Sequence, residues 1–268
     1  MRIARLRTSD GIVIVAETPE GYRRILGDPD SSVAVDPATA ELGDAVVGEV
    51  LAPIAPGKIV AIGLNYLDHI REASMDVPRS PLIFTKFTSS VVGTGAAIRF
   101  DPSDIRRVDW EVEHAVVIGT TTKSVPAERA LESVFGYTIA NDVSAREAQF
   151  ADGQWVRGKS LDTFCPLGPV IVTADEIPDP QALALGTRVN GESVQNSSTK
   201  EMVFGVADLI SYCSRFFTLG PGDLILSGTP WGCGEFMTPQ RSLQDGDVVE
   251  TWIDGIGSIT NPVSAPVA

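Results

Sequence analysis

Short apolar stretches, separated by glycine, proline and Asx turns, recur along the chain and predict strands more often than helices. Three pairs of stretches have the pattern of a hairpin, around the turns Thr8–Gly11, Asn190-Gly191 and Asp254-Gly255. Single stretches predict further strands, at residues 58–64, 81–87, 108–119, 136–144 and 224–230. The pattern therefore indicates a mostly β, or α+β, fold.

Helical periodicity is confined to a few segments. The longest is residues 203–217, where Val206, Leu209, Ile210 and Cys213 form an apolar stripe. Shorter helices are predicted at residues 65–73, 127–134 and 145–151. Residues 27–44 are rich in Pro, Asp and Ala and suit a loop or a short-helix connection.

The run from Leu51 to Gly57 holds two prolines and a glycine, which resist regular structure. We place a boundary there. The prediction is a small N-terminal domain, residues 1–55, in front of a main domain, residues 56–268.

The composition describes a soluble globular protein: 268 residues, 43% hydrophobic and 21% charged. A net charge of −14 excludes nucleic acid and anionic membrane surfaces as partners, because both repel an acidic protein. No apolar run could span a membrane, and the first residues lack the apolar core of a signal peptide. Three widely spaced cysteines favour reduced thiols. We therefore expect a cytoplasmic protein.

Two carboxylates interrupt the apolar stretch 108–119. On a strand, Glu111 and Glu113 project from one face, while Trp110, Val112 and His114 share the other. Two like charges on a part-buried strand cost free energy unless a group neutralises them. A divalent cation such as Mg²⁺, Mn²⁺ or Ca²⁺ would do so. A solvent-facing pair on an edge strand is the alternative that this stretch alone leaves open.

His69 and Glu72 are three residues apart on a predicted helix, so their side chains can touch. They form either a surface pair or a general base that a carboxylate holds in one tautomer. Gly63 before the segment and Pro78 after it would let it move as a lid.

Three further positions have a structural and a functional interpretation. Asp142, at the polar end of strand 136–144, either finds partners in a site or caps helix 145–151. Arg146 and Gln149 share one face of that helix and could line a pocket. Lys159, in the predicted loop 158–169, which is rich in glycine and proline, is either a surface lysine or the cation of a site. The glycines of Gly93-Thr94-Gly95 lack the third glycine and the helix of a dinucleotide site, so we reject that interpretation.

Five motifs, taken in this order, resemble the fumarylacetoacetate hydrolase family over roughly residues 57–263. They are Asn65-Tyr66-x-x-His69-x-x-Glu72, Asp109-Trp110-Glu111-Val112-Glu113, Asn141-Asp142-Val143-Ser144-x-Arg146, Gly158-Lys159-Ser160-x-Asp162 with Gly168-Pro169, and Ser227-Gly228-Thr229-Pro230-x-Gly232. The resemblance implies rolled, mixed β-sheets behind a smaller N-terminal domain, in a homodimer.

The resemblance also implies roles for these residues. Mg²⁺ or Mn²⁺ would be held by Glu111, Glu113 and Asp142. His69 and Glu72 would be a water-activating dyad on a mobile lid, and Lys159 would polarise the substrate. Thr229 would help hold the substrate carboxylate, and Arg146 and Gln149 would line the pocket.

The family acts on 2-oxo and β-diketo acids. We therefore expect a metal-dependent hydrolase of carbon–carbon bonds in acylpyruvate or fumarylpyruvate-like compounds of aromatic catabolism, acting through an enolate. The alternatives are an oxaloacetate-type decarboxylase and a 5-carboxymethyl-2-hydroxymuconate-type isomerase on the same site. A metal-stabilised binding protein without activity is the non-enzyme alternative.

The chain departs from the family pattern at three positions. His114 stands where leucine is common, and strand alternation turns it away from the carboxylates, so we expect a hydrogen-bonded structural histidine and not a metal ligand. Trp231 and Cys233 are bulkier than the small residues expected in the glycine loop. We expect them to reshape the substrate pocket.

Overall fold

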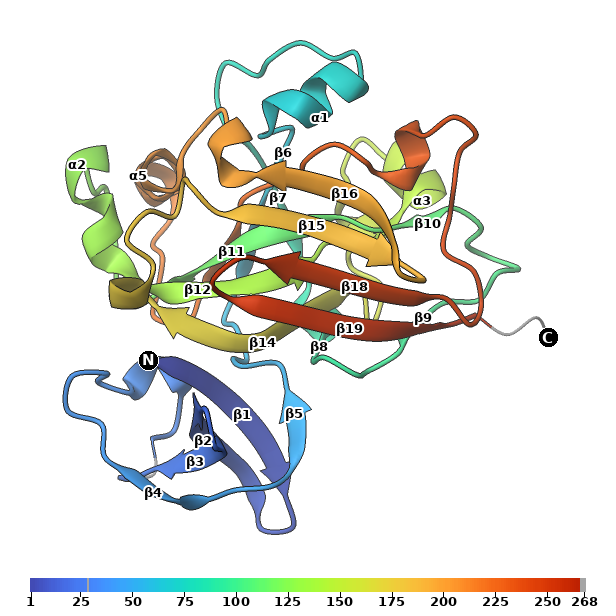
Figure 1. The fold of residues 1–268 in the computed structure, drawn as a ribbon. Coiled ribbons are helices and arrows are strands. Elements are labelled where there is room, and N and C mark those ends of the chain that lie inside the picture. The colour runs from blue at the N-terminus through green and yellow to red at the C-terminus, as the bar shows by residue number, and fades with distance from the viewer. Residues whose placement is uncertain (28, 266–268) are drawn as a thin grey trace.

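The computed structural model describes residues 1–27 and 29–265. It is mostly β, as predicted, with short helices around the sheets (Figure 1). No helix in the described part of the chain is long and apolar enough to cross a membrane.

The larger sheet runs through the whole molecule. Its strands are, in spatial order, β4 (Leu42–Ala45), β3 (Gly21–Ile25), β2 (Gly11–Thr18), β1 (Arg2–Thr8), β14 (Cys165–Thr173), β12 (Val134–Asn141), β11 (Val112–Ile118), β17 (Leu224–Leu226), β6 (Ile59–Gly63) and β7 (Leu82–Lys86). Two short strands join it from the side, β5 (Glu49–Leu51) on β1 and β8 (Val91–Val92) on β14.

A second sheet packs against the first. Its order is β16 (Glu192–Ser198), β15 (Ala184–Val189), β18 (Val248–Ile253), β19 (Gly257–Ser264) and β9 (Ile98–Arg99). The predicted hairpins around Asn190-Gly191 and Asp254-Gly255 are confirmed as β15–β16 and β18–β19. A third pair joins β10 (Val108–Asp109) to β13 (Ser144–Ala145).

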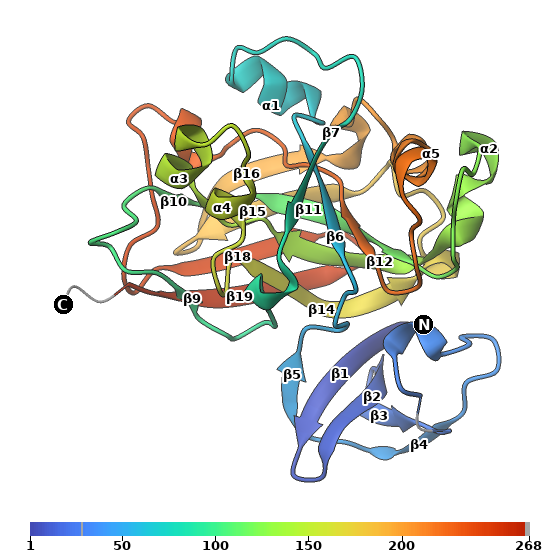
Figure 2. The same cartoon turned by 180° about the vertical axis from the view of Figure 1, so that it is seen from behind.

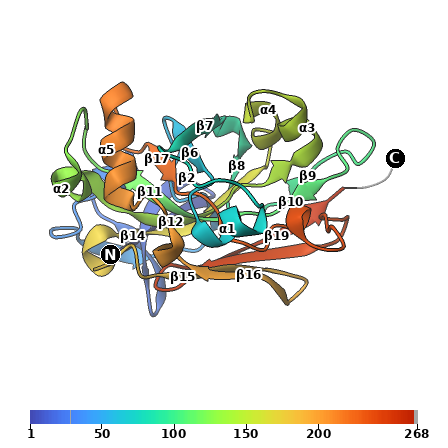
Figure 3. The same ribbon diagram turned by 90° about the horizontal axis from the view of Figure 1, so that it is seen from above.

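The helices are short and lie at the periphery (Figure 3). They are α1 (Leu67–Glu72), α2 (Ala127–Ala130), α3 (Arg146–Ala151), α4 (Val156–Lys159) and α5 (Val206–Phe216). Single 3₁₀ turns are η1 (Ser32–Ala34), η2 (Thr88–Ser90), η3 (Leu131–Ser133), η4 (Ala174–Glu176), η5 (Thr199–Glu201) and η6 (Gly234–Phe236). The predicted stripe of α5 is buried at all four positions.

Strand β11 lies at the centre of the core, between β12 and β17, and every one of its side chains is buried. Val112, Val116 and Ile118 pack into one apolar cluster. Ala115 and Val117 pack into another. The predicted alternation is therefore confirmed over Val112–Ile118, where it leaves Glu113 on the face opposite Val112 and His114, whereas Trp110 packs in a separate cluster.

The N-terminal strands form a separate lobe below the main body (Figures 1 and 2). The hairpin β1–β2 around Thr8–Gly11 is confirmed. However, β1 also pairs antiparallel with β14, Arg2 opposite Val172 and Ile3 opposite Ile171. The lobe thus continues the main sheet, and the domain boundary at residues 55–56 stays a prediction.

Two expected elements were wrong. The single strand 108–119 is broken, because the Trp110 amide bonds the Asp109 carboxylate and the Glu111 amide bonds the Asn141 side chain, so both leave the ladder. The predicted loop 158–169 begins inside α4 and ends in β14. Strand β14 is held by β12 and β1, and such tertiary pairing overrides the local turn pattern of its glycine and prolines.

Candidate active site

The three predicted metal ligands meet at one point. Each of Glu111, Glu113 and Asp142 offers an oxygen, and these atoms all lie within 4.8 Å of one another. The pairing of β11 with β12 causes this, since Val112 stands opposite Asn141 and the carboxylates flank that pair. All three side chains are buried. Asp142 is thus part of a buried cluster and not the cap of α3.

Two buried lysines neutralise much of this charge. Lys159 Nζ lies 2.6 Å from Glu111 Oε2 and 2.7 Å from Asp142 Oδ2. Lys86 Nζ donates to Asp142 Oδ1 at 2.6 Å and also to the Lys159 carbonyl. Asp142 is therefore bonded by a lysine on each oxygen. Sequence reasoning missed Lys86, although a lysine that ends an apolar strand is a signal that could have found it.

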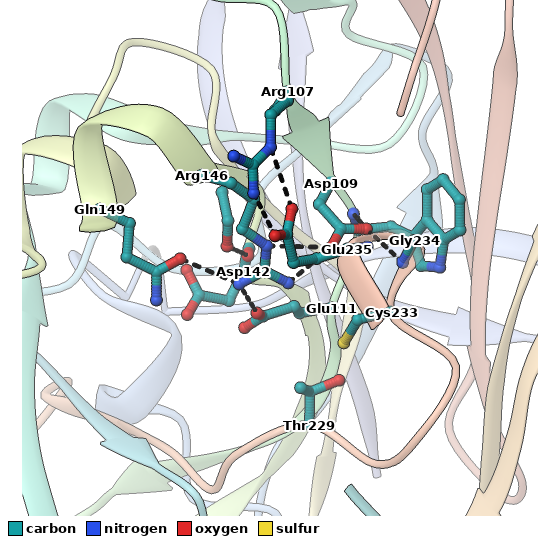
Figure 4. Close-up of polar contacts among 12 residues, drawn as sticks. Arg107, Asp109, Glu111, Asp142, Arg146, Gln149, Thr229, Cys233, Gly234 and Glu235 are labelled. Atoms are coloured by element: carbon teal, nitrogen blue, oxygen red, sulfur yellow. Dashed lines mark hydrogen bonds and ion pairs between the residues drawn. The ribbon is translucent and has the colours of Figure 1, made fainter. Parts of the chain in front are cut away.

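Arg146 supplies a third cation. Its guanidinium lies 2.7 Å from Glu111 Oε1, 2.6 Å from Asp109 Oδ2 and 2.9 Å from Gln149 Oε1 (Figure 4). Arg146 and Gln149 therefore sit together at the edge of the carboxylate cluster. Asp109, for which no role was predicted, is the second carboxylate that Arg146 binds.

Asp109 also holds the loop that follows β17. Its Oδ1 accepts the Gly234 amide at 2.8 Å, and its Oδ2 accepts the Glu235 amide at 3.1 Å (Figure 4). Arg107 adds an ion pair to the Glu235 side chain. One buried carboxylate thus fixes Arg146 on one side and the loop on the other.

The neighbouring cations neutralise Glu111 but not Glu113, and the pKa values of these two carboxyl groups shift in opposite directions. Burial alone would raise the pKa of Glu111, but the charges of Lys159 and Arg146 outweigh it and lower that pKa to about 2. Burial, followed by repulsion from Asp142 and Glu111, raises the pKa of Glu113 well above its usual range. Glu113 has no ion-pair partner among the described residues and accepts the Gly228 amide at 2.7 Å.

This donor set fits a hard divalent ion. Three convergent carboxylates suit Mg²⁺ or Mn²⁺, which bind oxygen ligands and keep further positions for water or substrate. The neighbouring lysines and Arg146 leave one carboxylate, Glu113, without a cation, so a metal would remove the remaining repulsion.

The predicted dyad is also formed. His69 Nδ1 lies 3.2 Å from Glu72 Oε2, and Glu72 Oε1 accepts the Gly232 amide at 2.9 Å. The Phe236 ring packs edge-on against the His69 ring, with centroids 5.3 Å apart. Glu72 is therefore held at both oxygens, and His69 is held in a fixed orientation.

The loop between β17 and η6 can present these amides because two of its glycines have positive φ, 95° at Gly228 and 97° at Gly232. A side chain at Gly232 would collide with the Val194 carbonyl. The glycines expected from the motif therefore serve to bring backbone N–H groups to Glu113 and Glu72.

One cavity of about 230 Å³ joins the two clusters. Its polar wall contains most of the predicted site residues: His69, Glu111, Glu113, Arg146, Gln149, Lys159 and Thr229. Its remaining wall is apolar and includes Met75, Phe84, Phe150, Trp155 and Phe236. Glu72 and Asp142 are not among the lining residues. Each contacts a residue that is, Glu72 through His69 and Asp142 through Lys159.

Thr229 is oriented by a residue that the sequence did not reveal. Gln195 Nε2 donates to Thr229 Oγ1 at 2.9 Å, and Gln195 Oε1 accepts the Val112 amide at 3.0 Å. Because the Thr229 oxygen accepts this bond, its own hydrogen is free to donate into the cavity. Gln195 carries no local signal, since it lies in an ordinary hairpin strand.

His114 lies on the strand face that alternation predicted, but the expected hydrogen bond was wrong, because the ring is buried against Tyr137 and no polar group in the described part of the chain reaches its nitrogens. It is fully buried, both ring nitrogens lack a hydrogen-bond partner, and its ring stacks on Tyr137 with centroids 4.9 Å apart. Burial lowers the pKa of His114 to about 3, so the ring is neutral. His114 belongs to neither cluster of metal-ligand candidates.

Neither of the two bulky loop residues is among those that line the described cavity, so the expectation that they reshape the substrate pocket stays a prediction. Trp231 is 44% exposed and donates to the Asn196 carbonyl. Cys233 is fully buried and lies beside His69 and Glu72. Burial raises the pKa of its thiol well above the usual range.

Comparison with known proteins decides the family. The model of the fumarylacetoacetate (FAA) hydrolase C-terminal domain matches residues 58–264. The chain belongs to this family. A mitochondrial oxaloacetate tautomerase of Xenopus laevis is 51% identical over 217 residues, which are 80% of this chain and 68% of that protein.

Solved structures agree. A fumarylacetoacetate hydrolase from Exiguobacterium antarcticum superposes with a TM-score of 0.87 at 39% identity, over 99% of this chain and 100% of that one. A 5-carboxymethyl-2-hydroxymuconate delta-isomerase from Mycobacterium smegmatis gives 0.85 at 38% identity, over 99% and 100%. The expected fold of this hydrolase family is confirmed.

Proposed function

We propose that this protein is a metal-dependent enzyme that interconverts the keto and enol forms of a 2-oxo acid of the oxaloacetate class. The similar proteins named above include an oxaloacetate tautomerase and an isomerase. These proteins support the alternatives, an isomerase or an enzyme that acts on oxaloacetate, better than they support the carbon–carbon hydrolase that was the first expectation from the sequence. The observation that carries the proposal is that His69 of the dyad and Glu111 and Glu113 of the carboxylate cluster line one cavity.

Glu111, Glu113 and Asp142 would hold Mg²⁺ or Mn²⁺. When bound there, the metal would act as a Lewis acid toward the carboxylate and 2-oxo oxygens of the substrate.

His69 is the proposed base. Its Nδ1 is occupied by Glu72, which fixes the tautomer and leaves Nε2 to take the proton from the carbon next to the 2-oxo group. The electron pair of that C–H bond forms the carbon–carbon double bond, and the π pair of the 2-oxo group moves onto its oxygen. The proton held at Nε2 is then transferred to that oxygen to complete the enol. Glu72 stabilises the imidazolium that forms in between.

Lys159 and Thr229 would hold the oxygens of the substrate. An ammonium has three N–H donors, and two of those of Lys159 reach Glu111 and Asp142. The third remains for the oxygen on which negative charge develops. The Thr229 hydroxyl hydrogen, left free by Gln195, suits a substrate carboxylate.

The test is a substrate panel with and without EDTA. Oxaloacetate dissolved in its enol form is followed by its ultraviolet absorbance, and 5-carboxymethyl-2-hydroxymuconate is measured alongside. We expect the enzyme with Mg²⁺ or Mn²⁺ to accelerate ketonisation well above the rate with metal alone, and EDTA to abolish this. Binding of Mn²⁺ without turnover of any 2-oxo acid would refute the proposal and favour the binding-protein alternative.

Hydrolysis of acylpyruvates is the second candidate. The same His69–Glu72 pair could deprotonate water, and the apolar wall at Phe150 and Trp155 suits an acyl group. Acetylpyruvate would then yield acetate and pyruvate. Decarboxylation of oxaloacetate is measured in the same panel as release of CO₂.

We also propose a homodimer, which the family resemblance implies. Sedimentation velocity at two protein concentrations measures this. The predicted cytoplasmic location stays a prediction, and the similar Xenopus laevis protein is named as mitochondrial.

A further inference from the structure

We propose that His69, Glu72 and Cys233 form a second metal site, separate from the three carboxylates, that takes Zn²⁺ or a metal of similar softness and inhibits the enzyme. Each of the three residues offers one ligand atom, and these atoms all lie within 4.8 Å of one another. His69 and Cys233 are buried and Glu72 is half-buried.

The spacing is close to that of zinc ligands. Zinc bonds of about 2.0–2.3 Å to nitrogen, oxygen and sulfur in a tetrahedron place the ligand atoms roughly 3.3–3.8 Å apart. His69 Nδ1 and Glu72 Oε2 are already 3.2 Å apart. Small rotations of the Cys233 and Glu72 side chains would complete the three-ligand set. His69 also lines the cavity, from which a water molecule would supply the fourth ligand.

Hydrogen bonds hold the backbone on both sides of Cys233. Glu72 Oε1 accepts the Gly232 amide, so the residue next to Cys233 is already tied to the carboxylate that would share the metal. The amide of Gly234, on the other side of Cys233, is held by Asp109 at 2.8 Å. Both neighbours of Cys233 are thus fixed, which suits a preformed site.

The two sites differ in chemistry. Glu111, Glu113 and Asp142 offer only oxygen, which suits Mg²⁺. The second cluster offers imidazole, thiolate and carboxylate, a set that favours Zn²⁺ over Mg²⁺. Zinc present in small amounts beside excess Mg²⁺ would therefore select the site with sulfur.

Binding there would have two effects. The metal would bind Nδ1 of His69, so the ring proton would move to Nε2 and that nitrogen could no longer act as the base. The Cys233 thiol would release its proton to solvent as it binds. The metal would also link α1, which carries His69 and Glu72, to the loop that carries Cys233. The inhibition rests on the proposed function, whereas the binding of metal does not.

The experiment uses Co²⁺ and Zn²⁺ on the whole enzyme saturated with Mg²⁺. Co²⁺ bound to a thiolate gives a charge-transfer band in the near ultraviolet. We expect the band in the wild type and in Cys213→Ala, a matched control for a buried cysteine on α5. We expect no band in Cys233→Ser or Cys233→Ala, and at least a tenfold higher Zn²⁺ concentration for half-inhibition in these variants.

A band that persists in both Cys233 variants would overturn the site, and equal zinc inhibition in wild type and variants would place zinc at the carboxylates instead. X-ray absorption of Zn²⁺ on the wild type needs no variant, and it must show one sulfur in the first shell. Because the band does not depend on turnover, a failed substrate panel with a positive band would refute the proposed function and leave the metal site standing.

Discussion

Asp109 and Arg146 form a buried ion pair, in which Asp109 Oδ2 accepts the Nε and Nη2 hydrogens of Arg146 at 2.9 and 2.6 Å. The remaining nitrogen of Arg146 reaches Glu111 at 2.7 Å. Arg146 therefore bridges a proposed metal ligand and the carboxylate that anchors the loop of Gly232 and Cys233. Through this bridge, the carboxylate cluster and the dyad depend on the same few contacts.

Replacing Asp109 by Ala should destabilise the protein by about 3–5 kcal/mol, because Arg146 would lose one partner of a buried pair and two loop amides would lose their acceptor. Urea unfolding measures the loss. Glu132→Gln, which removes an exposed ion pair with Arg129, is the control and should leave the midpoint unchanged. Equal midpoints for Asp109→Ala and wild type would contradict the anchoring role.

Replacing His69 by Ala should lower kcat by roughly 10²–10⁴-fold, the usual contribution of a general base. Binding of Mn²⁺, followed by electron paramagnetic resonance, should be unchanged, because His69 is not one of the three carboxylates. Arg71→Ala, on the exposed side of the same helix, is the control and should retain the wild-type kcat. Normal activity of His69→Ala would remove the residue from the mechanism.

Replacing Lys86 by Met should destabilise the metal-free protein by about 3–5 kcal/mol, since Asp142 would keep only Lys159 as a cation. Mg²⁺ should restore part of this loss, so the rise in Tm on adding Mg²⁺ should be larger in the variant than in wild type. Lys200→Met, at an exposed lysine, is the control. An equal rise in Tm in all three proteins would show that Lys86 and the metal do not share Asp142.

Replacing His114 by Leu should change how stability depends on pH. The folded pKa of about 3 lies below the ordinary 6.5, so the unfolded chain binds more protons between these values. The His114 contribution is thus complete above pH 6.5 and is lost as the pH falls, by about 1.4 kcal/mol per pH unit.

His114→Leu should abolish that part of the slope and leave stability at neutral pH equal or higher, because both unpaired nitrogens are removed. Urea unfolding from pH 7 to pH 5 tests this: the difference in unfolding free energy between wild type and variant should grow as the pH falls, with a slope that approaches about 1.4 kcal/mol per pH unit below pH 6. Stability profiles of wild type and variant that run parallel with pH would show that the folded protein protonates His114 as readily as the unfolded chain does, and would contradict the lowered pKa.

The sequence predicted those parts of the site that are encoded by local spacing. Strand alternation placed Glu111 beside Glu113, and the two do meet although Glu111 lies just before β11. Helical spacing placed His69 beside Glu72, so each pair could be predicted before any fold was known. The meeting of Asp142 with these carboxylates was expected only from the family resemblance. The pairing of β11 with β12 is its physical cause.

The missed residues act across long separations. Lys86 meets Asp142 56 positions later, and Gln195 meets Thr229 34 positions later. No periodicity encodes such contacts. The break at Trp110–Glu111 was missed for a related reason, since side chains of Asp109 and Asn141 take the backbone N–H groups that an unbroken strand would use.

The pairing of β1 with β14 has a consequence for solubility. With β12 on one side and β1 on the other, β14 has no free edge where it carries Ile171 and Val172. A chain shortened by its first lobe would expose this apolar edge to other molecules, and such edges template aggregation. The N-terminal lobe thus protects β14, the strand that follows Lys159, from pairing with other molecules. This role is independent of any contribution of the lobe to substrate selection.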